Sequence, residues 1–203
     1  MHAVNDRREA FSGTLLATLS DLSGRPLKTK SWPVELPPAT ARRVAVFDVA
    51  KLLGGLPPAE AHLEAVLTDQ SGRVASSASA LFVPDRLAAL ADPGLETAVA
   101  VADGLATITL RARRSLARHV MIECRGLDLD VSDNFFDLPV GPPAQVTAPA
   151  PDGLTADQLA ERLVVRCLND VPRTSRLSAA LIRARIQLKP VSLLSRLIFA
   201  LQK

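Results

Sequence analysis

The densest group of side chains that could contact a ligand is the Asp-Asn-Phe-Phe-Asp segment at residues 133–137. Carboxylates and amides can hydrogen-bond to sugar hydroxyls, and Phe rings can stack on sugar rings. The same residue types also form strand corners, where Asp and Asn satisfy turn backbone and one Phe fills the core, and we favour this interpretation. The candidates for contact with a substrate or with another domain are Asp133, Asn134, Phe135, Phe136 and Asp137.

Trp32 is the single tryptophan and stands next to Pro33. Its ring could serve as a platform for a sugar. Because Trp buries a large apolar area, we favour packing in the core or between domains, and keep Trp32 as a second contact candidate. The chain has six Phe and no Tyr, which counts mildly against an independent carbohydrate-binding module.

Other residues with chemical potential are scattered. The three histidines, His2, His62 and His119, have no metal-ligand spacing to Cys, Asp or Glu. No Gly-x-Ser-x-Gly motif supports a serine nucleophile. We interpret four isolated carboxylates as solvent-facing charges on strands rather than an acid/base pair: Glu35, Glu64, Glu96 and Glu123. The sequence therefore predicts no catalytic residue, no metal site and no cofactor.

Cys124 and Cys167 are the two cysteines. Free cysteine is among the most buried residue types, so we favour two buried thiols. The alternative is one bridge between neighbouring strands of the second module, which would require an oxidising compartment.

The elements that must position these residues are mainly strands in the first half of the chain. Residues 13–21 and 61–69 alternate between apolar and polar side chains, as half-buried strands do. Pro33 interrupts the strand at 27–36, which indicates an edge strand or a bulge, because proline cannot donate to a ladder. Residues 20–25 and 68–73 have nearly the same sequence, so we expect one hairpin turn to be used twice.

The second half of the chain also consists mainly of predicted strands. Asp103-Gly104 is a strong hairpin signal between strands at 97–102 and 106–112. Further strand segments are expected at 119–124, 129–138, 144–148 and 163–168, and Thr155 begins a capping box. Short strands separated by turn signals predict an all-β fold of two tandem immunoglobulin-like β-sandwiches, at 1–84 and 85–172.

The tail at residues 173–203 differs. Apolar residues recur at helical spacing in 175–188 and again after Pro190, through Leu194, Leu197, Ile198 and Leu201. No acidic residue follows Asp170, so we expect two short basic amphipathic helices. Such a tail could dock on another protein, which we favour slightly, or lie on an anionic membrane surface; a third interpretation gives it no selected role.

The formal net charge is +3, and because the basic excess belongs to the tail, the body gives no support for nucleic-acid binding. Met1 is followed by polar and charged residues rather than an apolar leader, and no stretch is long and apolar enough to cross a membrane. We therefore expect a cytoplasmic location.

The segment V-S-D-N-F-F-D-L-P-V-G at residues 131–141 is similar to the signature in the last domain of β-mannosidases of glycoside hydrolase family 2. Residues 106–110, 116–120 and 168–170 resemble other strands of that domain, in the same order. The Val-Asn-Asp at residues 4–6, followed by Gly-Thr-Leu at 13–15, resembles the start of the preceding immunoglobulin-like domain. The resemblance covers residues 2–172 and excludes the tail.

Enzymes of this family hydrolyse terminal β-mannose with two glutamates of a barrel that lies upstream of these domains. Nothing in this sequence resembles the segments that carry them, and a barrel needs about 250 residues. The resemblance implies a fragment, subunit or truncated product without activity of its own. It would pack on the catalytic barrel, in cis or as a separate chain, and support the cleft for a β-mannoside glycan. The alternative is a free-standing carbohydrate-binding or adhesion module.

Overall fold

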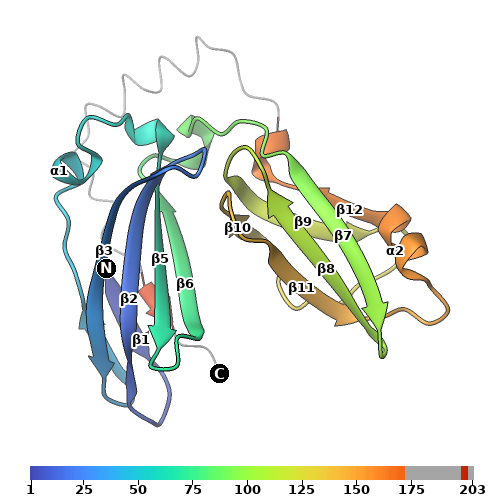
Figure 1. Cartoon of the computed structure of the whole chain (residues 1–203), viewed down its shortest axis with the longest axis horizontal. Helices are drawn as coiled ribbons and strands as arrows, with labels where there is room; N and C mark the ends of the chain where they lie inside the picture. Colours follow the sequence, from blue (N-terminus) through green and yellow to red (C-terminus); the bar gives the residue numbers. More distant parts are fainter. Residues whose placement is uncertain (172–197, 201–203) are drawn as a thin grey trace. The chain divides into compact units, whose positions relative to one another are not determined.

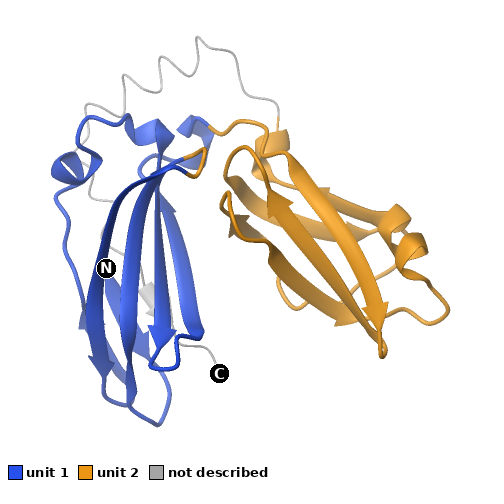
Figure 2. Ribbon diagram, viewed as in Figure 1, with its two compact units in different colours: residues 1–21, 25–89, 174–203 blue, residues 22–24, 90–173 orange. Residues whose placement is uncertain are grey.

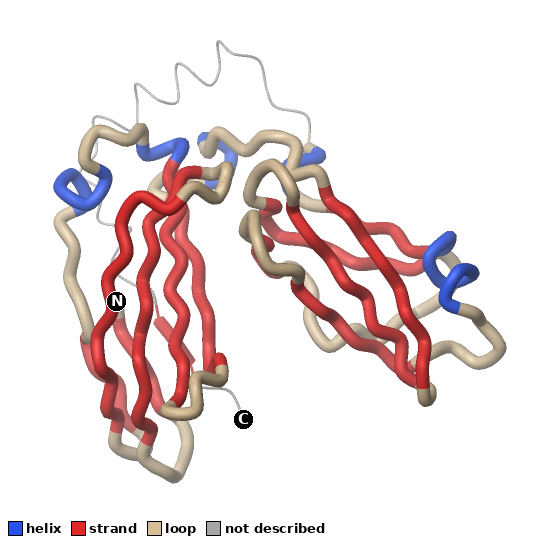
Figure 3. Tube along the Cα trace, in the orientation of Figure 1, coloured by secondary structure: helices blue, strands red, loops and turns tan. Residues whose placement is uncertain are grey.

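A computed structural model describes residues 1–171 and 198–200. The chain forms two compact units, coloured separately in Figure 2. The first contains Met1–Asp21, Arg25–Ala89 and the strand β13 (Ile198–Ala200), and the second contains Leu22–Gly24 and residues 90–171. The sequence placed the domain division after residue 84, and the units divide between Ala89 and Leu90. Strands dominate both units (Figure 3), which confirms the all-β class.

The main sheet of the first unit is antiparallel, with the strand order β3-β2-β5-β6 (Figure 1). Its strands are β2 (Phe11–Asp21), β3 (Pro26–Leu36), β5 (Ala61–Asp69) and β6 (Val74–Leu81). The predicted alternation in β2 is confirmed, because Leu15, Ala17 and Leu19 are buried while Thr14 and Leu16 are exposed. Pro33 lies in β3, which is an edge strand as predicted.

A second sheet in this unit has the order β13-β1-β4, where β1 is His2–Asn5 and β4 is Thr40–Arg43. Ala3 of β1 shares one core with Leu15, Leu36 and Leu67 of the main sheet, so the two sheets pack as layers of a sandwich. The short helix α1 (Val49–Leu53) and the 3₁₀ helices η1 (Pro58–Glu60) and η2 (Asp85–Leu87) complete the unit. Asp48 caps α1 by accepting a hydrogen bond from the Lys51 N–H.

The helix expected after Pro190 is wrong at Ile198–Ala200, where the structure has strand β13. β13 pairs in parallel with β1, with His2 opposite Ile198 and Val4 opposite Ala200. β1 pairs with β4 on one side only, so its other edge offers unpaired backbone groups that an Ile-Phe-Ala segment can satisfy. Pairing with this open edge stabilises a strand at Ile198–Ala200 although the apolar residues of the tail recur at helical spacing. The rest of both predicted tail helices lies outside the described residues.

The repeated hairpin is confirmed. The Asp21 carboxylate accepts a hydrogen bond from the Arg25 N–H, and the Asp69 carboxylate accepts one from the Arg73 N–H, each at 3.0 Å. Gly24 and Gly72 take φ values of 86° and 82° in the same place of each turn. The hydrogen bond from the Ser71 hydroxyl is the largest cause that lowers the pKa of Asp69.

The second unit contains two facing three-stranded sheets. One has the order β11-β8-β7, from β7 (Leu95–Ala102), β8 (Leu105–Ala112) and β11 (Ala144–Pro149). The other has the order β10-β9-β12, from β9 (Ala117–Cys124), β10 (Phe136–Leu138) and β12 (Leu163–Arg166). Ile108, Leu110, Val120 and Val146 are fully buried in the shared core. Asp103 and Gly104 both have positive φ, which confirms the predicted hairpin between β7 and β8.

Helix α2 (Ala156–Arg162) closes one end of this unit. Thr155 and Gln158 form the predicted capping box at its start. Leu159 is fully buried against Ala106 and Cys124, which fixes the helix on the sandwich. The 3₁₀ helix η3 (Leu168–Asp170) ends the first described range. Neither α2 nor any other helix among the described residues is long and apolar enough to span a membrane.

Candidate functional site

The predicted contact segment crosses from one sheet of the second unit to the other. At its start, the Ser132 N–H donates to the Thr147 carbonyl of β11 at 2.7 Å, and the Thr147 N–H donates to the Ser132 hydroxyl at 3.0 Å. Two residues later, Asn134 is bonded to Ile122 of β9, in the opposite sheet. The segment therefore joins the two layers, and only Phe136–Leu138 of the expected strand segment 129–138 form a ladder.

The side chain of Asn134 replaces a peptide group in this crossing. Its Oδ1 accepts from the Ile122 N–H at 2.9 Å, and its Nδ2 donates to the Ile122 carbonyl at 3.1 Å. A carboxamide carries a donor and an acceptor as a peptide unit does, so it can pair with a strand residue. The Asp133 carboxylate accepts from the Asn134 N–H at 2.8 Å. These bonds are those of a structural corner.

Asp137 is tied to the start of β9. Its carboxylate forms an ion pair with the Arg118 guanidinium and accepts a hydrogen bond from the His119 N–H at 3.1 Å. The side chains of Arg118 and Asp137 are only 15% and 13% exposed. The loss of either partner would remove the ion pair from a charge that is mostly buried, so the pair stabilises the corner.

Asn169 supports the same strand from the far end of the sequence. Its Oδ1 accepts from the Arg118 N–H at 3.0 Å, and its Nδ2 donates to the carbonyls of Ala91 and Leu116 at 2.6 and 2.9 Å. No local pattern in the sequence predicts a role for Arg118 or Asn169. Their partners lie far away along the chain, and the resemblance at 116–120 and 168–170 was the single available signal.

The two phenylalanines of the segment have different roles. Phe136 pairs with Val120 and packs against the core. Phe135 is 62% exposed and has φ = +61°, a left-handed conformation that is rare for bulky residues. Its N–H donates to the Val120 carbonyl at 2.7 Å and to Asn134 Oδ1 at 3.1 Å, so this one donor is shared between β9 and the corner. Among the large apolar side chains that are exposed in residues 1–171, Phe135 is the aromatic one.

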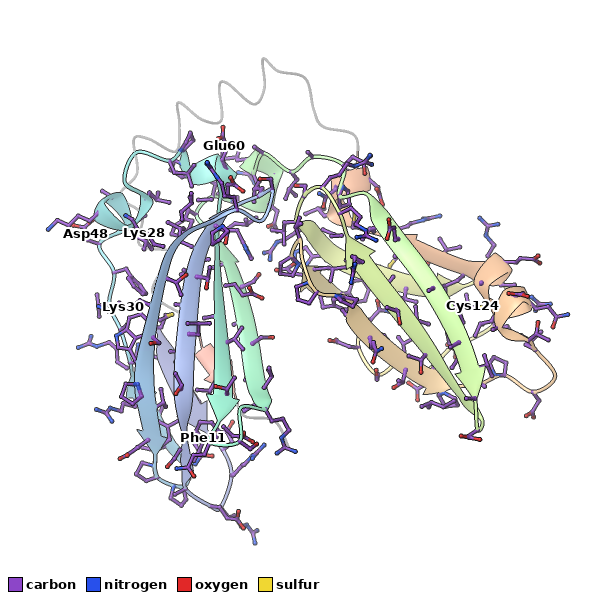
Figure 4. All side chains as sticks on the ribbon, viewed as in Figure 1. Phe11, Lys28, Lys30, Asp48, Glu60 and Cys124 are labelled. Atoms are coloured by element: carbon purple, nitrogen blue, oxygen red, sulfur yellow. The ribbon has the colours of Figure 1, made fainter. Side chains whose placement is uncertain are left out.

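Trp32 lies in the other unit. It is half-buried against the core of the first sandwich. Its ring meets Phe47 edge to face, with centroids 5.8 Å apart, and the Lys30 ammonium lies 5.3 Å from its centroid. Lys30 is labelled on this unit in Figure 4. The structure brings residues 133–137 together in one corner, and places Trp32 in a packed cluster of its own unit.

The four carboxylates do not form an acid/base pair within the sheets. Opposite Glu35, Glu96 and Glu123 stand Ser12, Arg111 and Val164, respectively, and Glu64 lies between Thr18 and Ser79. Glu35, Glu96 and Glu123 are exposed as expected, but Glu64 is half-buried, and burial raises its pKa. In residues 1–171 and 198–200, no group of three His, Cys, Asp or Glu side chains could hold a metal ion.

Both cysteines are free and buried, so the favoured prediction is confirmed and the bridge is not formed. The register of β12 against β9 explains this, because Leu163 lies opposite Cys124, and Arg166 lies opposite Met121. Cys167 therefore continues towards Val120, about 13 Å along the strand from Cys124 (labelled in Figure 4). A disulfide needs Cα atoms within about 7 Å. Burial is the largest cause that raises the pKa of Cys167.

Comparison with domain families gives two adjacent matches. Residues 1–86 match the sequence model of the Mannosidase Ig/CBM-like domain, and residues 90–171 match that of the Ig-fold domain found in mannosidases. The comparison with curated proteins gave no match. The family resemblance seen at residues 2–172 and the two immunoglobulin-like folds are thereby confirmed.

Solved structures show the same fold. A β-D-mannosidase from Dictyoglomus thermophilum aligns with a TM-score of 0.69 at 18% identity, over 82% of this chain and 20% of that one. An exo-chitosanase from Amycolatopsis orientalis aligns with a TM-score of 0.58 at 20% identity, over 82% of this chain and 24% of that one. This chain thus spans a fifth to a quarter of the length of these two proteins.

Proposed function

Residues 1–86 and 90–171 are two mannosidase-type immunoglobulin-like domains in tandem, and on this premise we propose that the chain is an accessory, non-catalytic region of a glycoside hydrolase. Its role is to pack on the catalytic barrel and to support the cleft that binds a β-mannoside. The barrel lies in the same polypeptide or in a separate chain. A family 2 β-mannosidase is the proposed parent.

One observation carries this proposal. The structural likeness covers 82% of this chain but only 20% of the β-D-mannosidase, so most of that protein has no counterpart here. A retaining glycosidase needs two carboxylates about 5 Å apart. In the part of the chain that the structure describes, Glu35, Glu64, Glu96 and Glu123 do not face another carboxylate across a ladder. The domains therefore support chemistry that takes place elsewhere.

The first test measures the chain alone. Purified protein is incubated with 4-nitrophenyl β-D-mannoside and, because an exo-chitosanase has the same fold, with the β-D-glucosaminide. We expect no release of nitrophenol above the buffer blank. Turnover that follows the protein through purification would refute the non-catalytic assignment.

The second test measures association. The tagged chain is incubated with an extract of its source cells, and the eluate is assayed for hydrolysis of the same two glycosides. We expect β-mannosidase activity to be retained on the tagged chain and absent from a tag-only column. An eluate without either activity contradicts association with a catalytic module in trans.

A free-standing carbohydrate-binding module is the second candidate, because Phe135 is an exposed aromatic ring. The packing of Trp32 against Phe47 weakens it, since the single tryptophan is not presented as an open platform. Affinity electrophoresis in gels with and without β-mannan separates the two candidates. Retardation by mannan would favour the binding module, and unchanged mobility favours the accessory role. A cytoplasmic location stays a prediction.

A further inference from the structure

The second sheet of the first unit includes a strand from the far end of the sequence. Residues 1–89 supply six strands, and β13 (Ile198–Ala200, red in Figure 1) is the seventh. In the order β13-β1-β4 it pairs with β1, so without it the described sheet consists of β1 and β4. An isolated pair of strands is marginally stable, and constant-type immunoglobulin sandwiches have seven strands. The first sandwich is therefore incomplete until β13 is in place.

The strand β1 is fixed by contacts that do not involve β13. It pairs with β4 along its whole length. Just before it, the Met1 carbonyl accepts a hydrogen bond from the Val44 N–H at 3.0 Å, and at its end the buried Asn5 side chain donates to the carbonyls of Leu36 and Pro37. The other edge of β1 is thus held extended in advance. A preorganised edge loses little conformational entropy when a further strand is added to it.

The strand β13 lies next to both layers of the sandwich. It runs parallel to β1, with Phe199 opposite the fully buried Ala3. It also lies beside β6, which is the edge strand of the main sheet. Ile and Phe are residue types that favour strands, and native proteins cover strand edges because an open edge pairs with other chains. The structure therefore shows what occupies this edge: three residues of the chain's own C-terminal part.

We infer that the edge of β1 is a strand-acceptor site and that Ile198–Ala200 is its resident ligand. The site takes an extended apolar peptide that enters parallel to β1 and binds through backbone hydrogen bonds, as in β-augmentation. This gives the end of the tail a role within the first sandwich, where the sequence left docking on another protein, membrane binding and no role as alternatives. The inference is independent of the proposed function, because no catalytic module takes part in it.

The first test disables the strand in the full chain. Phe199→Pro combined with Ala200→Pro removes two successive N–H groups, which point to opposite edges of the strand, so a donor to β1 is lost whichever residue supplies it. Gln202→Pro combined with Lys203→Pro, beyond β13, is the matched control. We expect the prolines in β13 to speed hydrogen exchange by about tenfold or more at one or more amides of residues 2–4. They should also lower the Tm reported by the fluorescence of Trp32, which packs on the core of the first sandwich, by about 5 °C, and the control should match wild type.

The second test supplies the strand as a separate peptide. A tethered segment has an effective concentration on the order of 1 mM, so a strand that occupies the edge in cis should also occupy it as a free peptide at about 5 mM. A peptide of residues 194–203 is added to the full chain that carries the prolines in β13. The same peptide with Phe199→Pro and Ala200→Pro is the control. We expect the peptide to restore about half or more of the lost protection at residues 2–4, and the control peptide to restore none.

Four outcomes would overturn the inference. If the prolines in β13 leave exchange and Tm as in wild type, the strand does not complete the sandwich. If protection is lost and the peptide does not restore it, the edge is not an acceptor site. Equal rescue by both peptides would show that binding does not use backbone pairing. A wild-type dimer that becomes monomeric with the prolines on gel filtration would show that the strand is donated to a second copy.

Discussion

Asn5 in the first sandwich and Asn134 in the second both fasten loop backbone through a side-chain amide, but at different depths. Asn5 is fully buried, its Nδ2 lies within 2.8–3.2 Å of the carbonyls of Glu9, Leu36 and Pro37, and its Oδ1 accepts from the Arg7 N–H. Asn134 is half-buried and forms hydrogen bonds with the N–H and the carbonyl of Ile122. Asn5 holds the strand β1 in place, whereas Asn134 also holds an aromatic side chain out in solvent.

We interpret Asn5 as a residue that only stabilises the fold, and Asn134 as one that also holds a neighbouring side chain in solvent. The hydrogen bonds described above for the Asn5 side chain all join it to backbone groups of the first sandwich. Around Asn134, the bonds close a corner and leave Phe135 strained and exposed. If the contrast is correct, substitutions at Asn5 should affect folding alone, and substitutions in the corner should affect folding and association in different proportions.

The largest expected effect comes from Asn5→Ala. This change removes the amide that donates to the carbonyls of Glu9, Leu36 and Pro37 and the Oδ1 that accepts from the Arg7 N–H, so we expect a loss of about 3 kcal/mol from the unfolding free energy of the first unit. Urea denaturation monitored through Trp32 fluorescence reports on that unit. A loss below about 0.5 kcal/mol, as for an ordinary surface substitution, would contradict the proposed fastening role.

Next in size is Asp137→Ala in the second unit. The mostly buried Arg118 guanidinium would lose its ion pair with Asp137, which we expect to cost about 2–3 kcal/mol, reduced from the fully buried case because both side chains keep some solvent contact. The double variant Asp137→Ala with Arg118→Met should recover part of this loss. If the two changes simply add, the ion pair is not coupled as described.

Asn134→Ala should have a smaller effect of about 1–2 kcal/mol on the second unit, since Asn134 is only half-buried and water can replace the amide. Asn134→Asp keeps the acceptor for the Ile122 N–H and loses the donor, so its effect should be intermediate at neutral pH. Hydrogen exchange at the Ile122 amide gives the readout. Unchanged protection in Asn134→Ala would show that the amide does not act as a strand substitute.

The smallest expected effect concerns Glu64 on β5 of the first sandwich. Burial raises its pKa above the ordinary value of 4.5, so the folded state binds the proton more tightly than the unfolded state does. Its contribution to stability is therefore present at low pH and is lost as the pH rises through the folded pKa. Glu64→Gln should stabilise the first unit at pH 7 and show no gain below pH 4.5. Thermal melts of both proteins across this range measure the difference, and a gain that is independent of pH would reject the titration of Glu64 as its cause.

Local patterns in the sequence predicted the elements that depend on neighbouring residues. Alternation identified β2, and the repeated Asp-to-Arg turn and Asp103-Gly104 identified hairpins, because each of these is decided within a few residues. The edge position of β3 followed from Pro33. The sequence did not predict that Phe135 is exposed and Phe136 packs on the core, because this depends on the residue of β9 to which Asn134 is bonded.

Long-range pairing explains the remaining differences. Asn169 reaches Ala91 and Leu116, which no local pattern relates to it. Ile198 has a helical spacing to its neighbours, yet it lies in a strand because the edge of β1 was open. The half-burial of Glu64 likewise arises only once three strands stand side by side.

The pairing of β1 with β13 has a consequence for synthesis on the ribosome. β1 emerges before every other strand that the structure describes, but one of its two neighbours is Ile198–Ala200. At about 5–20 residues per second, this strand follows roughly 10–40 seconds later. During that interval the edge of β1 that later pairs with β13 is open, and a chaperone could bind to it. The first sandwich is thus completed only after the strands of the second have been synthesised.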